Sequence, residues 1–286
     1  MVKSNEERWF SIFVNAVLAA IGITILFPLL YVVSISLTPY TEVLKNGGFV
    51  FLPKSITLQA YAELLRNAAI PQSLGVTVLV TLVGTILNVG LTTLLAYPLS
   101  RKMLPGRRVL IMMVVFTMLF NGGLIPTYMV VRATGLLDTL WALIIPGVIS
   151  SYNVLIVKTF IDKLPEELFE SARIDGASEF RLFCQILIPL SVPVMITIGL
   201  FCAVGHWNQY FAAIMYLTDR RWYPLQVTIR EILMQSQMPS LDVDQTLPTL
   251  TVQMSSIVFG SLPIVAIYPF LQKHLIKGMT IGAVKG

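Results

Sequence analysis

Charged residues are scarce in this chain of 286 residues. Asp, Glu, Lys and Arg make up 12% of it, whereas 56% is hydrophobic and the mean hydropathy is +0.78. A typical soluble domain is about 25% charged, and a core of this length cannot hide so much apolar surface. The deficit therefore excludes a soluble domain and predicts a polytopic membrane protein. The net charge of +5 is interpreted as loop asymmetry, with the lipid bilayer and no nucleic acid as a partner.

Cysteine is equally scarce. The chain has two cysteines, Cys184 and Cys202, and both lie in or beside one apolar stretch. They have neither the spacing of a metal site nor that of a disulfide framework. We interpret both as packing residues, and the sequence predicts no metal site and no catalytic residue.

Two further absences concern the source of energy. The chain contains no G-x-x-x-x-G-K-[ST] loop to hold phosphates, so we do not expect it to be an enzyme that hydrolyses ATP. The apolar stretches carry no Asp, Glu, Lys or Arg at a central position, which argues against proton-coupled transport. Any energy from ATP must then be supplied by a partner, which would hold the ATP and Mg.

Long apolar runs dominate what is present. A membrane span needs about 20 such residues, and six stretches qualify in a single all-α transmembrane domain. The first continues to about Leu37, which is too long for the apolar region of a signal peptide. The predicted spans are residues 12–37, 74–96, 109–131, 139–157, 183–204 and 250–271.

The distribution of Lys and Arg predicts the orientation. Thirteen of the 20 Lys and Arg residues flank the side shared by the two termini, and seven flank the other side. Positive loops face the cytoplasm, so both termini and the loop 158–182 are expected there.

The segment Pro165–Pro189 is the most charged part of the chain between two spans. Pro165 suits the first position of a helix, and Glu170 and Arg173 are spaced to pair on one face. Gly176 predicts a break, because glycine reaches φ > 0 without steric cost. Ser178 is a candidate cap for a second helix from about Glu179, which would bend into the next span at Pro189.

This segment resembles the coupling loop of ABC importer permeases. The family motif is Glu-Ala-Ala, then Gly, then an apolar-Leu-Pro sequence, and Glu170-Ser171-Ala172, Gly176 and Ile188-Pro189 match its spacing. Ser171 and Ile188 depart from it by small changes in volume. The alternative is an ordinary cytoplasmic loop with some helix. The resemblance implies a type I ABC importer fold in which this helix–turn–helix docks on a separate ATPase subunit. The coupling residues that it implies are Glu167, Glu170, Ser171, Ala172, Asp175, Gly176 and Ala177.

Amides stand where charges are missing from the spans. An amide in hydrocarbon must find a partner, so hydrogen bonding between helices is the first interpretation for any one of them. The second is that they line a polar pathway, with aromatic rings stacking on sugars. The cluster His206–Tyr210 also fits an interfacial belt. The candidate pathway residues are Asn88, Asn121, Asn153, Trp207, Asn208 and Tyr210.

The two longest outer segments are predicted to be structured. Residues 38–73 are expected to pack as a small cap. Residues 219–247 contain Ile229, Ile232 and Leu233 at the spacing of a short amphipathic helix. The resemblance to importer permeases implies that this loop reaches into the binding protein, which makes Trp222, Tyr223 and Ile229 candidate contacts, with a simple cap over the bundle as the alternative.

Other stretches narrow the resemblance to bacterial carbohydrate permeases. The tail Phe270–Gly286 is similar to that of the second permease subunit of maltose-type importers, and Asn121–Thr139 is similar to the oligosaccharide and polysaccharide branch. The resemblance implies three kinds of protein partner: a second homologous permease, two ATPase subunits and an extracytoplasmic solute-binding protein. The bilayer of the bacterial inner membrane is a further partner. The implied cargo is a sugar, and the alternatives are another polar solute, such as a polyol, phosphodiester or amino acid, or a passive channel or scaffold.

Overall fold

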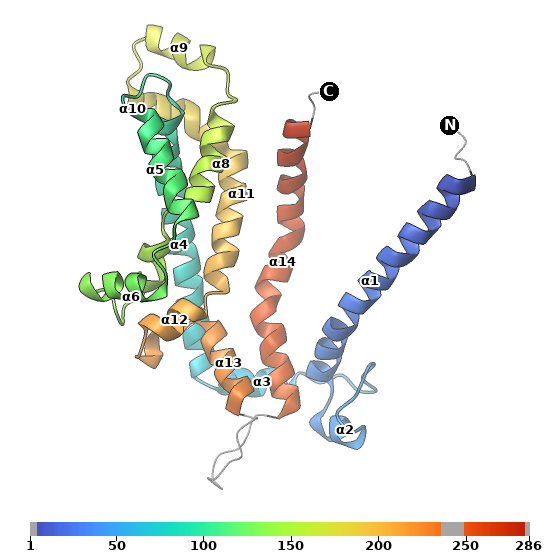
Figure 1. Cartoon of the computed structure of the whole chain (residues 1–286). Coiled ribbons are helices and arrows are strands. Elements are labelled where there is room, and N and C mark those ends of the chain that lie inside the picture. Colours follow the sequence, from blue (N-terminus) through green and yellow to red (C-terminus); the bar gives the residue numbers. More distant parts are fainter. Residues whose placement is uncertain (1–4, 236–248, 284–286) are drawn as a thin grey trace. The chain divides into compact units, whose positions relative to one another are not determined.

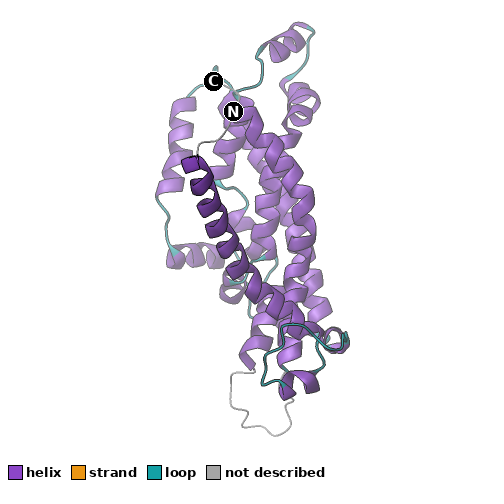
Figure 2. Ribbon diagram, turned by 90° about the vertical axis from the view of Figure 1, so that its right-hand side faces the viewer, coloured by secondary structure: helices purple, strands orange, loops and turns teal. Residues whose placement is uncertain are grey.

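The computed structural model describes residues 5–235 and 249–283, and every regular element in these ranges is a helix (Figure 2). Four helical segments are long and apolar enough to cross a membrane, and two bent helix pairs raise the number to six if each pair is one span. The unbroken segments are Trp9–Leu37 in α1 (Asn5–Leu37), α4 (Ala69–Ser100), Glu179–Trp207 and Leu250–Ile267 in α14 (Leu250–Ala283). The predicted all-α membrane architecture is confirmed.

The chain divides into two compact units. Unit 1 comprises residues 1–71 and 229–263, and unit 2 comprises residues 72–228 and 264–286. The side chains of the tail Phe270–Gly286 lie outside those that the structure describes. Unit 2 contains every predicted coupling and pathway residue, so it carries the candidate sites.

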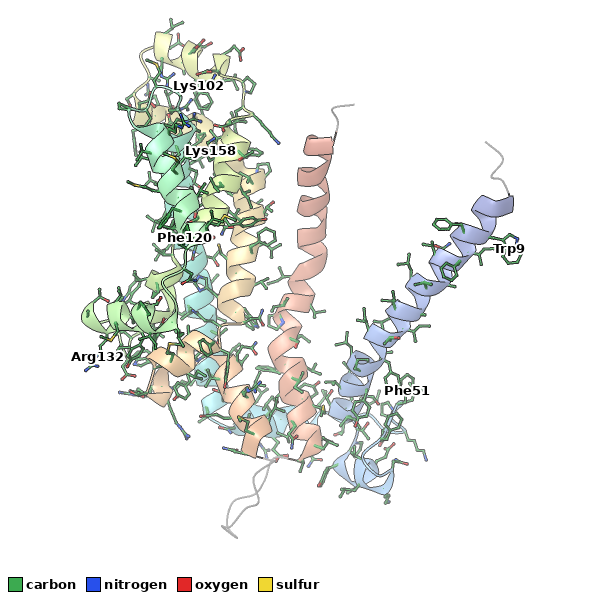
Figure 3. The ribbon with its side chains drawn as sticks, viewed as in Figure 1. Trp9, Phe51, Lys102, Phe120, Arg132 and Lys158 are labelled. Carbon is green, nitrogen blue, oxygen red and sulfur yellow. The ribbon has the colours of Figure 1, made fainter. Side chains whose placement is uncertain are left out.

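In unit 1 the segment after α1 packs back on the end of that helix. It contains α2 (Tyr40–Lys45) and α3 (Gln59–Arg66), and Figure 3 shows Phe51 and Trp9 at opposite ends of α1. The Ser34 hydroxyl donates to the Val50 carbonyl over 2.8 Å, and the Tyr31 hydroxyl donates to that of Gly48. Ile35, Val43 and Val50 form the buried core. The small cap predicted for residues 38–73 is therefore present.

Unit 2 is built around long helices that lie side by side. These are α4, α5 (Arg107–Leu119), α8 (Ser151–Ile161) and α11 (Ile188–Trp207) (Figure 1). Helices α4 and α11 approach closely at Gly199, where an added Cβ would lie 3.3 Å from the Val89 side chain. Their main buried core is Ala96, Tyr97, Leu99, Val154, Val157, Ile161, Phe169, Leu187, Val194 and Ile198.

The predicted span 109–131 is not one straight helix. It contains α5 and α6 (Leu124–Ala133), whose axes differ by 115°. Gly123 lies between them at φ +88°, a conformation that an L side chain rarely adopts. Pro126 lacks an N–H and is tolerated only in the first turn of α6. The composition of this stretch gave the apolarity of a span but not its bend.

The predicted span 139–157 is also bent. It contains α7 (Trp141–Ile144), the 3₁₀ turn η1 (Ile145–Gly147) and α8, with a bend of 52°. Pro146 has no backbone N–H to donate in η1. The Ser150 hydroxyl caps α8 by accepting the backbone N–H of Asn153. Both bends fall where glycine or proline interrupts an apolar run.

The predicted bend at Pro189 takes a different form. The chain runs from α10 (Glu179–Arg181) through a π-helical segment, η2 (Leu182–Leu187), directly into α11. Pro189 occupies the first turn of α11, where its missing N–H is harmless. The helix therefore continues past Pro189 without a break, whereas the sequence predicted a bend there.

Candidate coupling site and translocation surface

The predicted coupling segment forms a helix–turn–helix at one end of unit 2 (Figure 1). Helix α9 (Glu167–Ile174) ends at Asp175, and Gly176 follows at φ +82°. The Ser178 hydroxyl then accepts the Arg181 amide N–H at the start of α10. The predicted glycine turn and serine cap are both confirmed. Pro165 lies just before the cap Glu166 rather than in the first helical turn.

One face of this segment is buried and the other is open. Phe169 is 2% exposed and belongs to the core of the bundle, whereas Ile174 is 87% exposed. Five of the seven predicted coupling residues are exposed and the two alanines are half-buried. The exposed ones are Glu167, Glu170, Ser171, Asp175 and Gly176; Ala172 and Ala177 are the half-buried ones. The geometry thus presents an acidic, accessible surface on a rigid base.

The expected pair between Glu170 and Arg173 is not formed. The Arg173 guanidinium contacts the Glu179 carboxylate instead, with Nη2 3.0 Å from Oε1. The other oxygen of Glu179 accepts the Tyr97 hydroxyl over 2.6 Å. A carboxylate on α10 that also takes a donor from α4 is a better partner than one on the same exposed helix face, because it is held in place from two sides.

A cationic side chain is held between aromatic rings beneath α9. The guanidinium carbon of Arg101 lies 3.9 Å from the ring centroid of Phe169 and 4.5 Å from that of Tyr97. Its Nε and Nη2 atoms are buried and have no hydrogen-bond partner among the described residues. Cation–π contacts of this kind are worth about 2 kcal/mol each when desolvated. The stack joins the end of α4 to the buried face of α9.

A second contact joins the same two parts at the surface. The Lys102 ammonium donates to the Glu166 carboxylate over 2.9 Å, with both side chains at least half exposed. The hydrogen bond from Lys102 and the charge of its ammonium hold the pKa of Glu166 below its usual range. Figure 3 shows Lys102 and Lys158 at this end of unit 2. Solvent screens such exposed pairs, so this contact is weak beside the buried stack.

Asn88 forms hydrogen bonds between helices inside the bundle. Its amide nitrogen donates to the carbonyls of Gly147 and Val148, each over 2.9 Å, and its oxygen lies 2.8 Å from His206 Nε2. Gly84, one turn earlier on α4, makes room for the His206 ring, since an added Cβ would lie 2.4 Å from Nε2. This is the helix-to-helix bonding expected as the first interpretation, and it joins α4 to η1 and to the end of α11.

Asn121 lies at an open groove instead. The groove has a volume of about 680 Å³ and runs along the bend between α5 and α6 and the start of α8. Phe120, labelled in Figure 3, and Tyr152 are exposed aromatic rings in its lining. No charged residue lines it among the described residues. Its polar lining residues are Thr117, Asn121, Ser150, Ser151 and Tyr152.

The other pathway candidates are distributed between core and surface. Asn153 is buried, with its amide 3.5 Å from the Cys202 sulfur, and Trp207 is also buried. Asn208 is exposed and donates to the Val204 carbonyl of its own helix. Tyr210 packs against a second buried core of unit 2, which consists of Val76, Val80, Leu143, Ile144, Ala213, Leu217 and Val227. The structure does not bring these four residues to one surface with Asn121.

The end of unit 2 opposite α9 carries α12 (Phe211–Tyr216) and η3 (Arg220–Trp222) (Figure 1). Asp138 lies here at φ +58°, and its backbone N–H donates to the Tyr216 carbonyl. Its carboxylate accepts the Thr218 hydroxyl, the Thr218 N–H and the Asp219 N–H. These hydrogen bonds hold the pKa of Asp138 below its usual range. The carboxylate thus fixes the turn before α7 to the strand-like segment after α12.

The candidate contacts for a binding protein differ in accessibility. The predicted amphipathic helix is present as α13 (Leu225–Gln235). Ile229 is only 6% exposed, because it lies on the apolar face of that helix, so it is not an exposed anchor. Trp222 is exposed, and Tyr223 packs against a core. Residues 236–248 of this loop lie outside the described part of the chain.

Three residues at the coupling end were not predicted as site residues. Arg101 is one of the 13 Lys and Arg residues counted for the orientation, Phe169 is the one aromatic residue of α9, and Tyr97 lies at the end of an apolar span. A buried aromatic residue in an otherwise exposed, charged helix was the available signal for the contact. Nothing in the local sequence indicates which cation stacks on it.

The chain matches the family described as binding-protein-dependent transport system inner membrane component over residues 102–281. It belongs to that family. This permease is 42% identical to Protein LplC of Bacillus subtilis, covering 100% of this chain and 98% of that protein. It is 40% identical to the polygalacturonan/rhamnogalacturonan transport system permease protein YtcP of the same species, covering 98% and 100%.

A solved structure supports the same assignment. A chain of a bacterial ABC transporter that imports the acidic polysaccharide alginate superposes with a TM-score of 0.88 at 29% identity, covering 96% of this permease and 99% of that chain. The predicted ABC importer fold is therefore confirmed, and the chain is a multi-pass transport subunit rather than an enzyme. Members of this family work with a second permease, an ATPase and a solute-binding protein.

Proposed function

We propose that this permease forms half of the pathway of an ATP-driven importer for an oligosaccharide that derives from a polysaccharide. The observation that carries the proposal is the geometry of α9. Its acidic side chains are exposed, whereas Phe169 on the same helix is buried in the bundle. Such a surface suits docking on a separate ATPase, which holds the ATP and Mg. A solute-binding protein delivers the sugar on the opposite face, and a second homologous permease completes the pathway.

The cargo is inferred from relatives and from the groove. YtcP is named as a polygalacturonan/rhamnogalacturonan permease, and the structural neighbour imports alginate. The groove at Asn121 combines hydroxyl groups, an amide and aromatic rings, which suit sugar hydroxyls and ring faces. Because its lining is uncharged, we assign any neutralisation of an acidic sugar to the partner permease.

Reconstitution of the complete importer tests the cargo. The complex, purified through a tag on this chain, is placed in nanodiscs with its binding protein. Oligogalacturonides, alginate oligosaccharides and arabino-oligosaccharides are added in turn, with glycerol, glycerophosphodiesters and amino acids as the competing solutes. We expect ATP hydrolysis to rise only with an oligosaccharide. Stimulation by one of the competing solutes alone would refute the sugar assignment.

The orientation is tested separately. We propose that both termini and α9 face the cytoplasm, on the basis of the distribution of Lys and Arg. Single cysteines replace Ser178 and the exposed Leu52 in a variant that lacks Cys184 and Cys202. An impermeant maleimide should label Ser178→Cys only from the cytoplasm and Leu52→Cys only from outside. The reverse result would overturn the orientation. Ser240, another natural outer position, lies outside the described residues.

A further inference from the structure

We infer that Arg101 is a positioning residue that makes α9 and α4 move as one body during transport. This inference rests on the proposed function, because it concerns how a movement imposed on α9 reaches the pathway. Arg101 follows directly after α4, and its guanidinium lies between the rings of Tyr97 on α4 and Phe169 on α9. No other cation–π contact is present in the described residues of the chain.

The contacts of the coupling segment with α4 are concentrated on a few residues. Phe169 is buried in the core that contains Tyr97 and Leu99, and the Tyr97 hydroxyl donates to Glu179 on α10. Lys102 adds its exposed ion pair to Glu166. The polar and cation–π contacts among them involve Tyr97, Arg101 and Lys102, so the last turn of α4 and the residues just after it form one anchor of the coupling segment.

The cation–π contacts of Arg101 depend less strictly on angle than the hydrogen bonds of the coupling segment do. A hydrogen bond weakens steeply when its angle falls below about 120°, whereas a cation attracts a ring face anywhere within about 6 Å of the centroid. The Arg101 Nε and Nη2 atoms have no hydrogen-bond partner among the described residues, and two ring centroids lie within 4.5 Å of the guanidinium carbon. A planar guanidinium can contact two ring faces at once, which an ammonium cannot do as well.

The connection continues along α4 toward the middle of the bundle. Asn88 on α4 bonds the carbonyls of η1 and faces His206 at the end of α11. A displacement of the end of α4 therefore acts on the bent segment beside the groove at Asn121. A substitution of Arg101 removes the stack and so interrupts this connection at its start.

Distance measurements in the assembled complex test the inference. In a variant that lacks Cys184 and Cys202, spin labels are attached at Ile174→Cys on α9 and at Met103→Cys, which are 87% and 96% exposed. Distances are measured without nucleotide and after trapping with ATP, Mg and vanadate. With Arg101 present we expect one narrow distance that is the same in both states. Arg101→Met should broaden the distribution and make the distance depend on nucleotide, and Arg101→Lys should lie between.

Transport provides the second measurement. With the sugar that stimulates the wild-type complex, the number of sugars imported per ATP hydrolysed should fall about tenfold in Arg101→Met, which corresponds to about 1.4 kcal/mol. Arg108→Gln is the matched control, since it removes an exposed cation from the next helix and should leave both measurements at wild-type values. A narrow, nucleotide-independent distance in Arg101→Met would overturn the inference.

Two further variants keep the test decisive. If Arg101→Met does not assemble, Phe169→Leu keeps the apolar volume and removes one ring face, and Tyr97→Phe keeps the ring and removes the bond to Glu179. Phe169→Leu should show the same broadening, and an unchanged distance would contradict the role of the stack. If the wild-type complex contains no ATPase that traps nucleotide, the proposed function fails. The nucleotide-free distances of the variants still decide whether the stack holds α9.

Discussion

The two ends of unit 2 are fastened by opposite means. At the α9 end, an aromatic side chain and a guanidinium are buried together, and the charged residues of the motif remain outside. At the end that carries α12, the exposed carboxylate of Asp138 holds two segments through hydrogen bonds to backbone N–H groups and a hydroxyl. The first joint is a buried stack of a cation on two rings, whereas the second fixes the direction of each bond.

This difference suits the two tasks. A joint that transmits a movement must hold its two parts together, and a buried stack is screened by salt much less than an exposed ion pair. A joint that fixes a turn needs directional bonds, and a carboxylate in contact with several donors supplies them. The contrast teaches that the same bundle is joined by a buried cation–π stack at one end and by directional hydrogen bonds at the other.

The largest expected effect comes from Gly176→Val. Gly176 has φ +82°, and an added Cβ meets no atom within 4 Å, so the penalty is backbone strain of about 1–3 kcal/mol rather than a clash. We expect transport to be lost while the protein remains in the membrane, measured by uptake and by immunoblot of membranes. Gly90→Val, at an exposed helical position with open space, is the control. Normal transport by Gly176→Val would show that the turn of the coupling segment need not be rigid.

The second-largest effect is expected from Gly84→Ala in the middle of the bundle. Gly84→Ala places a Cβ 2.4 Å from His206 Nε2, and the ring is held by Asn88, so overpacking should cost about 1–3 kcal/mol. We expect the unfolding midpoint of the purified complex to fall by several degrees, about 2–4 °C for each kcal/mol. Gly75→Ala on the same helix has open space and should not change the midpoint. An unchanged midpoint in Gly84→Ala would mean that α4 and α11 separate at little cost.

A smaller effect is expected at the fixed end, and it should depend on pH. The pKa of Asp138 is lowered in the folded protein, so its contribution to stability is complete above the usual pKa of 3.8 and is lost as the pH falls through the lower folded value. Hydrogen exchange of residues 217–219, corrected for the intrinsic effect of pH, should therefore accelerate below about pH 3.8. Asp138→Asn should exchange faster at neutral pH and lose this dependence. Equal protection in both proteins at neutral pH would contradict the role of the carboxylate.

The smallest effect should follow from removal of the exposed ion pair between Lys102 and Glu166 at the α9 end. Glu166→Gln breaks the ion pair with Lys102. The Glu166 side chain is 51% exposed and that of Lys102 is 77% exposed, and solvent-exposed ion pairs contribute little to stability. We expect uptake and the unfolding midpoint to stay within error of the wild type in 0.15 M salt. A large loss of uptake would show that the surface pair, rather than the buried stack, joins α9 to α4.

Much of the coupling site follows from local sequence. The turn at Gly176 and the cap at Ser178 depend on residues within one turn of each other, and both were predicted correctly. The pair of Glu170 with Arg173 was predicted from spacing alone and is replaced by Arg173 with Glu179. Spacing gives the possible partners on one helix, but a carboxylate fixed by a second helix offers better geometry.

The sequence by itself determined the class of the protein, the apolar stretches, the coupling motif and a short amphipathic helix within residues 219–247, because composition, periodicity and turn chemistry act over short distances. The tertiary structure alone decided the bends of 115° and 52°, the buried position of Ile229 and the partners of Asn88, Tyr97 and Arg101. Tyr97 and Glu179 are 82 positions apart, and Asn88 and His206 are 118 apart. Contacts between such distant residues depend on how the helices pack, and no local pattern specifies which buried polar group meets which.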